Sequence, residues 1–421
     1  MKFHCFLFPT ALSELMNSHQ KSLGILFVLS FIGDMNLAII NIASILIATR
    51  AGADTIAVGW LASAYGLAMI IMPALLGKLF EHIDRKISIS IAALGQLFVA
   101  LFFIGFGNSI IPLIIGNAVL GIVNSLFWPA IEASISERSG HAESTHKTSF
   151  FNYCMAWTFG SGIAPYIGGS LSDINVILAF MYCAIVYFIG FLLILFGFPS
   201  QNNLKNPDSS SIVSASSRMS QQKPSEEITQ SASLPSNGVL KIQIGLMLAV
   251  MVSTMGIKVL LSYFPNYAAM EQGLGWTGTL IGSVSLGFGI GRVGYYIIGR
   301  FFEVKYSNIP ICLAIFGSSV LVFSVLRNEI ALGILFLISG IAAAVLYVTS
   351  LELLLKIERK AKSTAAGVFD SFIGLGAAVS PLIAGLIASK NLLMPFILYA
   401  ILAYIISIIT LILGRKRANN Q

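Results

Sequence analysis

The sequence predicts an all-α membrane protein in which twelve transmembrane helices form two pseudo-symmetric six-helix halves. The 421 residues are 56% hydrophobic and only 10% charged, whereas soluble domains carry about a quarter charged residues. Apolar segments long enough to cross a hydrocarbon core of about 30 Å recur along the whole chain. One long polar segment divides these apolar segments into two equal groups.

The apolar segments predict helices rather than strands. They are longer than the strands of a membrane β-barrel and lack strict alternation of polar and apolar residues. A helix satisfies its own backbone hydrogen bonds in lipid, so helices are the expected spanning elements. The predicted spans are 23–48, 56–79, 87–107, 109–134, 148–171, 174–198, 241–268, 277–301, 308–326, 329–355, 363–388 and 392–413.

The pattern of spans predicts five parts of the chain. Residues 1–22 form a short cytosolic segment, because they contain Glu14 and His19 and no small-residue cleavage site of a signal peptide. Residues 23–200 form the N-terminal six-helix half and residues 241–413 the C-terminal half. Between them, residues 201–240 are rich in Ser, Gln, Asn and Pro and predict a flexible cytosolic linker. Residues 414–421 form a basic cytosolic tail.

The distribution of basic residues predicts the orientation in the membrane. With both termini in the cytosol, 20 of the 25 Lys and Arg residues lie on the cytosolic side. Only Arg50, Arg327 and Lys390 lie outside, while Lys258 and Arg292 lie within spans. Basic residues concentrate in cytosolic loops of membrane proteins, so we expect a multi-pass protein of the cell (inner) membrane. This location explains the net charge of +7 without a nucleic acid partner.

The sequence contains no motif that predicts an enzyme, a cofactor or a metal site. The four cysteines share no short spacing, and neither an HExxH motif nor a phosphate-binding loop of the GxxxxGK[ST] type occurs. We therefore expect no cofactor and no ATP-driven pump. The energy source would be the gradient of a proton, of another ion or of the substrate itself.

The two halves repeat each other weakly in sequence. The stretch GKLFE at 77–81 resembles GRFFE at 299–303, an offset of 222. GIVNSLFWPAIE at 121–132 resembles GIAAAVLYVTSLE at 340–352, and GSGIAPYIGG at 160–169 resembles GAAVSPLIAG at 376–385, with offsets of 219 and 216. Duplicated halves around a site at the membrane midplane are typical of secondary transporters.

These residues resemble the major facilitator superfamily over essentially the whole chain. The loop motif of that family, G-x-L-a-D-r-x-G-r-k, is matched by Gly77, Leu79, Arg85 and Lys86, while Glu81, His82 and Asp84 replace its Asp, Arg and second Gly. The fifth span resembles the motif G-x-x-x-G-P-x-x-G-G, which the family associates with drug–proton antiporters. Its positions are Gly160, Ala164, Pro165, Gly168 and Gly169, and Pro381 is the equivalent proline of the second half. The alternative is that these residues form a packing hinge between helices.

The resemblance implies a gate at the cytosolic ends of the spans. It implies that Glu81 latches the two halves together there, and Glu303 is its equivalent in the second half. Acid–arginine pairs resembling those of sugar porters follow spans four and ten; the alternative is ordinary charge at the membrane edge. The predicted gate residues are Gly77, Glu81, Asp84, Arg85, Lys86, Glu132, Arg138, Glu303, Glu352, Arg359 and Asp370.

Charged residues in the middle of spans are the strongest candidates for function, because each costs roughly 2.5–3.5 kcal/mol on insertion scales. Asp34 lies in the first span, and we expect it to bind a proton or another cation. Lys258 lies at a near-equivalent place in the seventh span and would pair with Asp34 or attract an anionic substrate. Arg292 lies in the eighth span and faces either the site or the cytosolic headgroups.

Several polar or aromatic residues complete the predicted substrate site. The candidates are Asp34, Asn41, Tyr65, Asn124, Trp157, Lys258, Tyr263 and Arg292. For the uncharged residues the alternative is ordinary packing or anchoring at the membrane interface. For Asp34 it is a static ion pair.

The sequence predicts a secondary active transporter that works by alternating access. The leading expectation is proton-coupled export of small amphipathic or cationic compounds, motivated by the fifth-span motif and Asp34. One alternative is a proton symporter or facilitator for a small organic, anionic solute. Another is a membrane receptor that binds its ligand without moving it. The expected partners are a small-molecule substrate and the lipid bilayer, and we expect a monomer.

Overall fold

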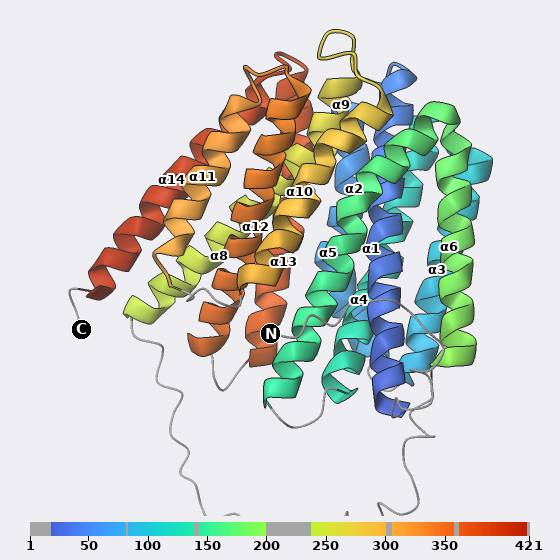
Figure 1. Ribbon diagram of the computed structural model, residues 1–421, viewed down its shortest axis with the longest axis horizontal. Helices are drawn as coiled ribbons and strands as arrows, with labels where there is room; N and C mark the ends of the chain where they lie inside the picture. The colour runs from blue at the N-terminus through green and yellow to red at the C-terminus, as the bar shows by residue number, and fades with distance from the viewer. Residues whose placement is uncertain are drawn as a thin grey trace, which may run out of the picture.

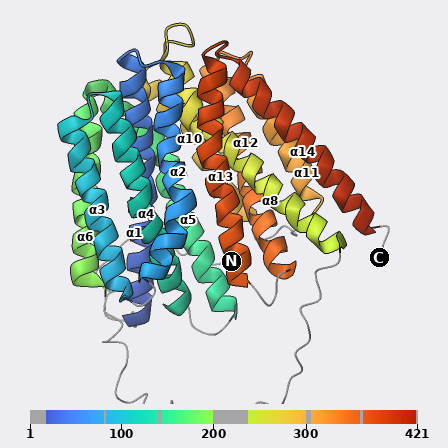
Figure 2. The same cartoon turned by 180° about the vertical axis from the view of Figure 1, so that it is seen from behind.

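The computed structural model describes residues 18–80, 83–138, 143–198, 237–299, 305–357 and 362–418. Within these ranges every regular element is a helix. Figure 1 shows the N-terminal helices, blue to green, standing beside the C-terminal helices, yellow to red, and Figure 2 shows the same two groups from behind. The end of the bundle at which α1 begins and α14 ends is called the inner end below. The opposite end is called the outer end.

Six helices form the N-terminal half. They are α1 (Ser18–Arg50), α2 (Thr55–Phe80), α3 (Arg85–Phe106), α4 (Ile110–Arg138), α5 (Glu143–Ile174) and α6 (Val176–Gly197). Short caps separate them: the Asp84 side chain accepts a hydrogen bond from the Lys86 amide, and Asn175 does the same for Ile177. These caps satisfy amides at the starts of α3 and α6 that have no partner within the helix.

Six spans form the C-terminal half, the first of which is interrupted. It consists of α8 (Asn237–Lys258), the π-helical turn η4 (Val259–Tyr263) and α9 (Phe264–Ala269). The others are α10 (Gly278–Ile298), α11 (Asn308–Val322), α12 (Glu329–Ile357), α13 (Lys362–Ala388) and α14 (Met394–Ala418). Ten of the described helical segments are long and apolar enough to cross a membrane by themselves. With α5 and α11 they give the predicted count of six and six.

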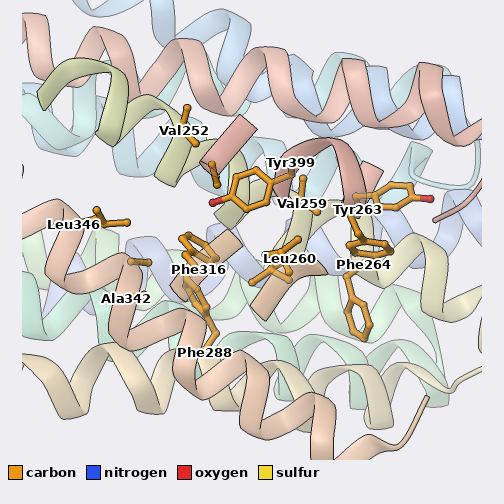
Figure 3. Close-up of a cluster of buried hydrophobic side chains, with 14 of the residues drawn as sticks. Val252, Val259, Leu260, Tyr263, Phe264, Phe288, Phe316, Ala342, Leu346 and Tyr399 are labelled. Carbon is orange, nitrogen blue, oxygen red and sulfur yellow. The ribbon is translucent and has the colours of Figure 1, made fainter. Parts of the chain in front are cut away.

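Each half has its own hydrophobic core. In the C-terminal half, Figure 3 shows buried side chains such as Leu260, Phe264 and Phe316 converging from α8, η4, α9, α11 and neighbouring helices. The rings of Phe264, Phe323 and Phe336 meet edge to face at centroid distances of 5.0 to 5.5 Å. Such aromatic contacts stabilise a core beyond the area that they bury. Each half is therefore packed as a unit of its own.

Two seams join the halves, and they are related by the internal repeat. Helix α2 packs on α13, and α5 packs on α10. In the first seam a Cβ on Gly59 would lie 2.7 Å from the Pro381 carbonyl oxygen. In the second, a Cβ on Gly282 would overlap the Pro165 carbonyl oxygen. Glycine on one helix thus meets the carbonyl of a helical proline on the other in both seams, and the backbones approach closely.

The Gly282 contact predicts a shift of conformation on substitution. Gly282→Ala should destabilise this closed arrangement by about 1–3 kcal/mol through overpacking, or roughly five- to hundred-fold in population. Spin labels at Ala51→Cys and Lys390→Cys, on exposed outer loops of opposite halves, should then report longer distances by electron resonance. Gly333→Ala is the matched control, because its Cβ would have nothing within 4 Å. Equal distance distributions for both variants would contradict the role of the seam.

Candidate functional site

Asp34 lies at the middle of α1 and contacts the other half of the molecule through charge. Its carboxylate interacts with the Ser161 side chain on α5 and electrostatically with Arg292 and Lys258. Its side chain is partly exposed, although it lies among helices of both halves. Among the described residues the only ion pair within 4 Å joins Arg50 and Asp173, so Asp34 is not locked in a tight ion pair.

Arg292 is the most buried charge of this group. It is 8% exposed, and its guanidinium carbon lies 4.6 Å from the Trp157 ring centroid and 5.8 Å from that of Phe288. Its buried Nε atom has no hydrogen-bond partner. The predicted alternative of a side chain extended to the headgroups is therefore not what this structure contains. A buried, unpartnered guanidinium donor is costly unless a ligand accepts its hydrogen bond.

Lys258 ends α8, immediately before the π-helical turn. Its Nζ lies 5.9 Å from the centroid of the Tyr65 ring on α2, and its side chain is partly exposed. The π-helical turn follows from Pro265, which has no amide proton to donate back to the Leu261 carbonyl. Asn41 of α1 donates to that carbonyl oxygen instead, at 3.3 Å, and also to the Ser262 hydroxyl at 3.3 Å. Single π-helical turns of this kind occur frequently at functional sites.

Asp34, Lys258 and Arg292 form what we call the charged centre. Two cations face one carboxylate, and the rings of Tyr65 and Trp157 lie against the cations. A charge in a membrane interior normally has a partner or contacts water. An excess of positive charge here is suited to an anionic group from outside the protein. The aromatic rings are suited to an apolar or aromatic portion beside that group.

The structure places the other predicted site residues away from this centre. Asn41 joins α1 to the π-helical turn, as described above. Asn124 is fully buried on α4 and accepts a hydrogen bond from Gln96 of α3 at 2.7 Å. Tyr263 donates to the Leu392 carbonyl oxygen at 2.6 Å and belongs to the core of the C-terminal half. These contacts correspond to the packing alternative of the sequence stage for Asn124 and Tyr263.

The outer ends of the halves are joined by side-chain hydrogen bonds. Thr49 of α1 donates to the Asn266 side chain at 2.7 Å, and Thr55 of α2 donates to the Gly385 carbonyl oxygen of α13 at 2.9 Å. Together with the two glycine seams, these contacts hold the outer end closed. The charged centre is therefore not open to the outer side in this structure.

An aspartate that the sequence did not single out forms the strongest outer contact. Asp173, at the end of α5, accepts hydrogen bonds from the amides of Gly278 and Thr279 at 2.8 and 2.6 Å, at the start of α10. It also accepts from the Thr279 hydroxyl at 2.7 Å and forms a short ion pair with Arg50. A carboxylate at a helix N-terminus is favoured by the helix dipole and by free amides. We call this contact the outer latch.

The outer latch should remain charged at neutral pH. Asp173 lies beyond the predicted span 148–171; partial burial raises its pKa, but hydrogen bonds from Thr279, Arg50 and Gly278 outweigh this and hold the pKa below its ordinary value. A lowered pKa stabilises the latched form above the ordinary value, and the contribution is lost as pH falls through the lowered value. Asp173 thus serves as a structural contact and not as a proton carrier near neutral pH.

Asp173→Asn should therefore weaken the closed outer end. Loss of a helix-capping group costs about 0.5–2 kcal/mol, or roughly two- to thirtyfold in population. The labels at Ala51→Cys and Lys390→Cys should show more of the longer distances than in the parent protein. Asp54→Asn is the control, because Asp54 caps α2 within its own half through the Ala57 amide. An unchanged distribution for Asp173→Asn would show that the latch does not hold the outer end.

Predicted gate residues fall partly within the described structure. Asp84 caps α3, Lys86 donates to the Leu195 carbonyl oxygen at 2.8 Å, and Arg138 lies 4.4 Å from the Phe198 ring centroid. Glu132 accepts a hydrogen bond from Tyr153 of α5 at 2.9 Å and interacts electrostatically with Asp370 of α13. Arg85 begins α3, and Glu352 lies near the inner end of α12. Glu81, Glu303 and Arg359 lie outside the described residues, and Gly77 is in α2.

The fifth-span motif contacts both neighbouring helices of α5. A Cβ on Gly160 would overlap the Phe31 carbonyl oxygen of α1, and a Cβ on Gly168 would lie 2.6 Å from the Ile42 side chain. On the other face, a Cβ on Gly169 would overlap the Gly278 carbonyl oxygen of α10. Pro165 lies between these glycines. The motif thus lets α5 pack closely on its own half and on the opposite half.

Comparisons with known proteins agree with this architecture. A family model described as Major Facilitator Superfamily matches residues 26–326. A solved peptide transporter POT in complex with sulfate is similar, with a TM-score of 0.70, 14% identity and coverage of 94% of this chain and 95% of that one. A POT family transporter in complex with a thioalcohol-conjugated peptide has a TM-score of 0.71 and 16% identity, covering 95% and 99%. The nucleoside transporter NupG has a TM-score of 0.63 and 13% identity, covering 94% and 99%.

Proposed function

The chain belongs to the Major Facilitator Superfamily, and we propose that it is a secondary transporter of a small organic solute that carries an anionic group. It is a multi-pass membrane protein and not an enzyme. The observation that carries the proposal is the unpartnered, buried Nε of Arg292 beside Lys258, with only one carboxylate between both halves to balance them. A carboxylate or similar group of the solute would accept hydrogen bonds from Arg292 and balance the second positive charge.

Asp34 supplies the coupling to protons in this proposal. It is ionisable, partly exposed and within electrostatic range of both cations, without a tight ion pair to hold it ionised. A bound anion near Arg292 and Lys258 reduces the positive field at Asp34, and a reduced positive field favours the protonated carboxyl. Binding of the solute and of a proton would therefore support each other.

Alternating access follows from the two seams and the outer latch. The outer end is closed by contacts of the Thr55–Gly385 and Asp173–Thr279 kind. Near the inner end, Glu132 and Asp370 are exposed although they belong to opposite halves. The solute would thus reach the charged centre from the inner side, which we assign to the cytosol, and rocking of the halves would expose it to the other side.

Export of a cationic compound in exchange for protons is the second candidate. It rests on the resemblance of the 160–169 stretch to the antiporter motif. The excess of positive charge at the charged centre favours the first candidate, because a second cation would be repelled there.

Reconstitution into vesicles with a pH-sensitive dye separates these candidates. Organic acids and amphipathic cations would each be added under a solute gradient while internal pH is recorded. Proton movement in the same direction as an organic acid supports the first candidate, and movement opposite to a cation supports the second. Binding without any flux of solute would contradict both and leave the receptor alternative.

A further inference from the structure

Two carboxylates from opposite halves lie near the charged centre and have no role in the proposal above. Glu132 of α4 and Asp370 of α13 interact electrostatically with each other. Both side chains are exposed, and among the described residues neither has a basic partner within 4 Å. We call these two residues the inner acidic pair. Like charges that face each other without a cation are unfavourable, so the arrangement is suited to a cationic group between them.

The inner acidic pair is connected to the charged centre by a short aromatic wall. On α5, Tyr153 hydrogen-bonds Glu132, and Trp157 lies against Arg292. These two residues are four positions apart, which is about 6 Å along a helix. The Tyr347 ring meets Trp157 edge to face at 6.3 Å and interacts electrostatically with Asp370 and Glu132.

The same short distance appears from a third residue. Cys154, next to Tyr153 on α5, interacts electrostatically with both Glu132 and Arg292. The acidic and basic groups are therefore part of one site, and the polarity of that site reverses within about one helical turn. The unpartnered Nε of Arg292 marks one end of the site, and the exposed carboxylates mark the other.

We propose that the substrate is a zwitterion whose anionic group binds Arg292 and Lys258 and whose amine binds Glu132 and Asp370. The two charged groups of the substrate are separated by an apolar or aromatic portion that lies against Trp157 and Tyr347. This inference rests on the proposed function for the anionic end and adds the amine end. Because Glu132 and Asp370 come from opposite halves, an amine between them also draws the inner ends of the halves together.

Three compounds of one shape test the proposal. They are 4-(aminomethyl)benzoate, which carries both charges, 4-methylbenzoate, which lacks the amine, and 4-methylbenzylamine, which lacks the carboxylate. Affinities would be measured with the full-length protein in lipid nanodiscs. Charged hydrogen bonds contribute about 1.5–3 kcal/mol, so the first compound should bind roughly ten- to hundredfold more tightly than either of the others.

Variants assign each end of the compound to its residues. Glu132→Gln should lower the affinity for 4-(aminomethyl)benzoate to that for 4-methylbenzoate and leave the latter unchanged, and Asp370→Asn should act in the same direction. Glu329→Gln, at the exposed outer start of α12, is the matched control. Equal affinities for the first two compounds, with no effect of either variant, would overturn the amine site alone. Failure of both carboxylates to bind would contradict the anionic site and with it the proposed function.

Discussion

Arg292→Gln is expected to lower the affinity for the anionic solute roughly ten- to hundredfold. A hydrogen bond to a charged group contributes about 1.5–3 kcal/mol, and each 1.4 kcal/mol is tenfold in affinity. The guanidinium is buried with a free Nε, so glutamine removes both the charge and the fork of donors. Concentration dependence of uptake into vesicles measures the effect.

Two controls separate binding from folding. Arg292→Lys keeps the charge but loses the paired donors, so its affinity should lie between those of the parent and Arg292→Gln. Arg327→Gln, at an arginine that donates to the Gly273 carbonyl oxygen near the outer end, should leave uptake unchanged. Because Arg292 has no ion-pair partner within 4 Å among the described residues, its removal should not lower the melting temperature of the empty protein. Unchanged affinity in a folded Arg292→Gln protein would remove Arg292 from the site.

Asp34→Asn is expected to abolish proton coupling while solute still moves down its own gradient. Asparagine keeps the shape and the contact with Ser161 but cannot bind and release a proton. The pH change that accompanies uptake should fall to that of vesicles without protein. The dependence of uptake on external pH should become flat.

The matched control for this change is Asp54→Asn, because Asp54 lies in the exposed outer loop before α2. It should couple protons as the parent does. Full coupling in Asp34→Asn would transfer the proton to another carboxyl, and the inner acidic pair would then be the next candidate. Loss of both coupling and downhill movement would instead indicate that Asp34 orients the helices.

Much of the fold could be predicted because lipid imposes a strict length on apolar segments. The twelve spans follow from runs such as 87–107, and the repeat of GKLFE and GRFFE relates the two halves. Asp34, Lys258 and Arg292 were also visible, since a charge in an apolar helix is rare and expensive. Their convergence from α1, α8 and α10 is what the structure adds.

Other features depended on contacts between residues distant in sequence. Asp173 resembles any acid at a helix end, and nothing in the chain predicts that it caps α10 of the other half. The π-helical turn has a local signal in Pro265, but a proline alone does not distinguish a kink from a π-helical turn. Asn41 was expected near the substrate because it shares a helical face with Asp34; its bond to Leu261 depends on that turn.

A counterflow experiment tests most directly whether one site is exposed alternately to both sides of the membrane. Vesicles are loaded with the unlabelled form of the solute that shows the largest uptake, and a trace of labelled solute is added outside without an ion gradient. The account predicts a transient accumulation of label above equilibrium, because the loaded site returns outward occupied, and it predicts that Arg292→Gln greatly reduces this overshoot. Label that only rises to equilibrium would indicate a passive pore, and binding without entry of label would indicate a receptor; either result would contradict a transporter with a single alternating site.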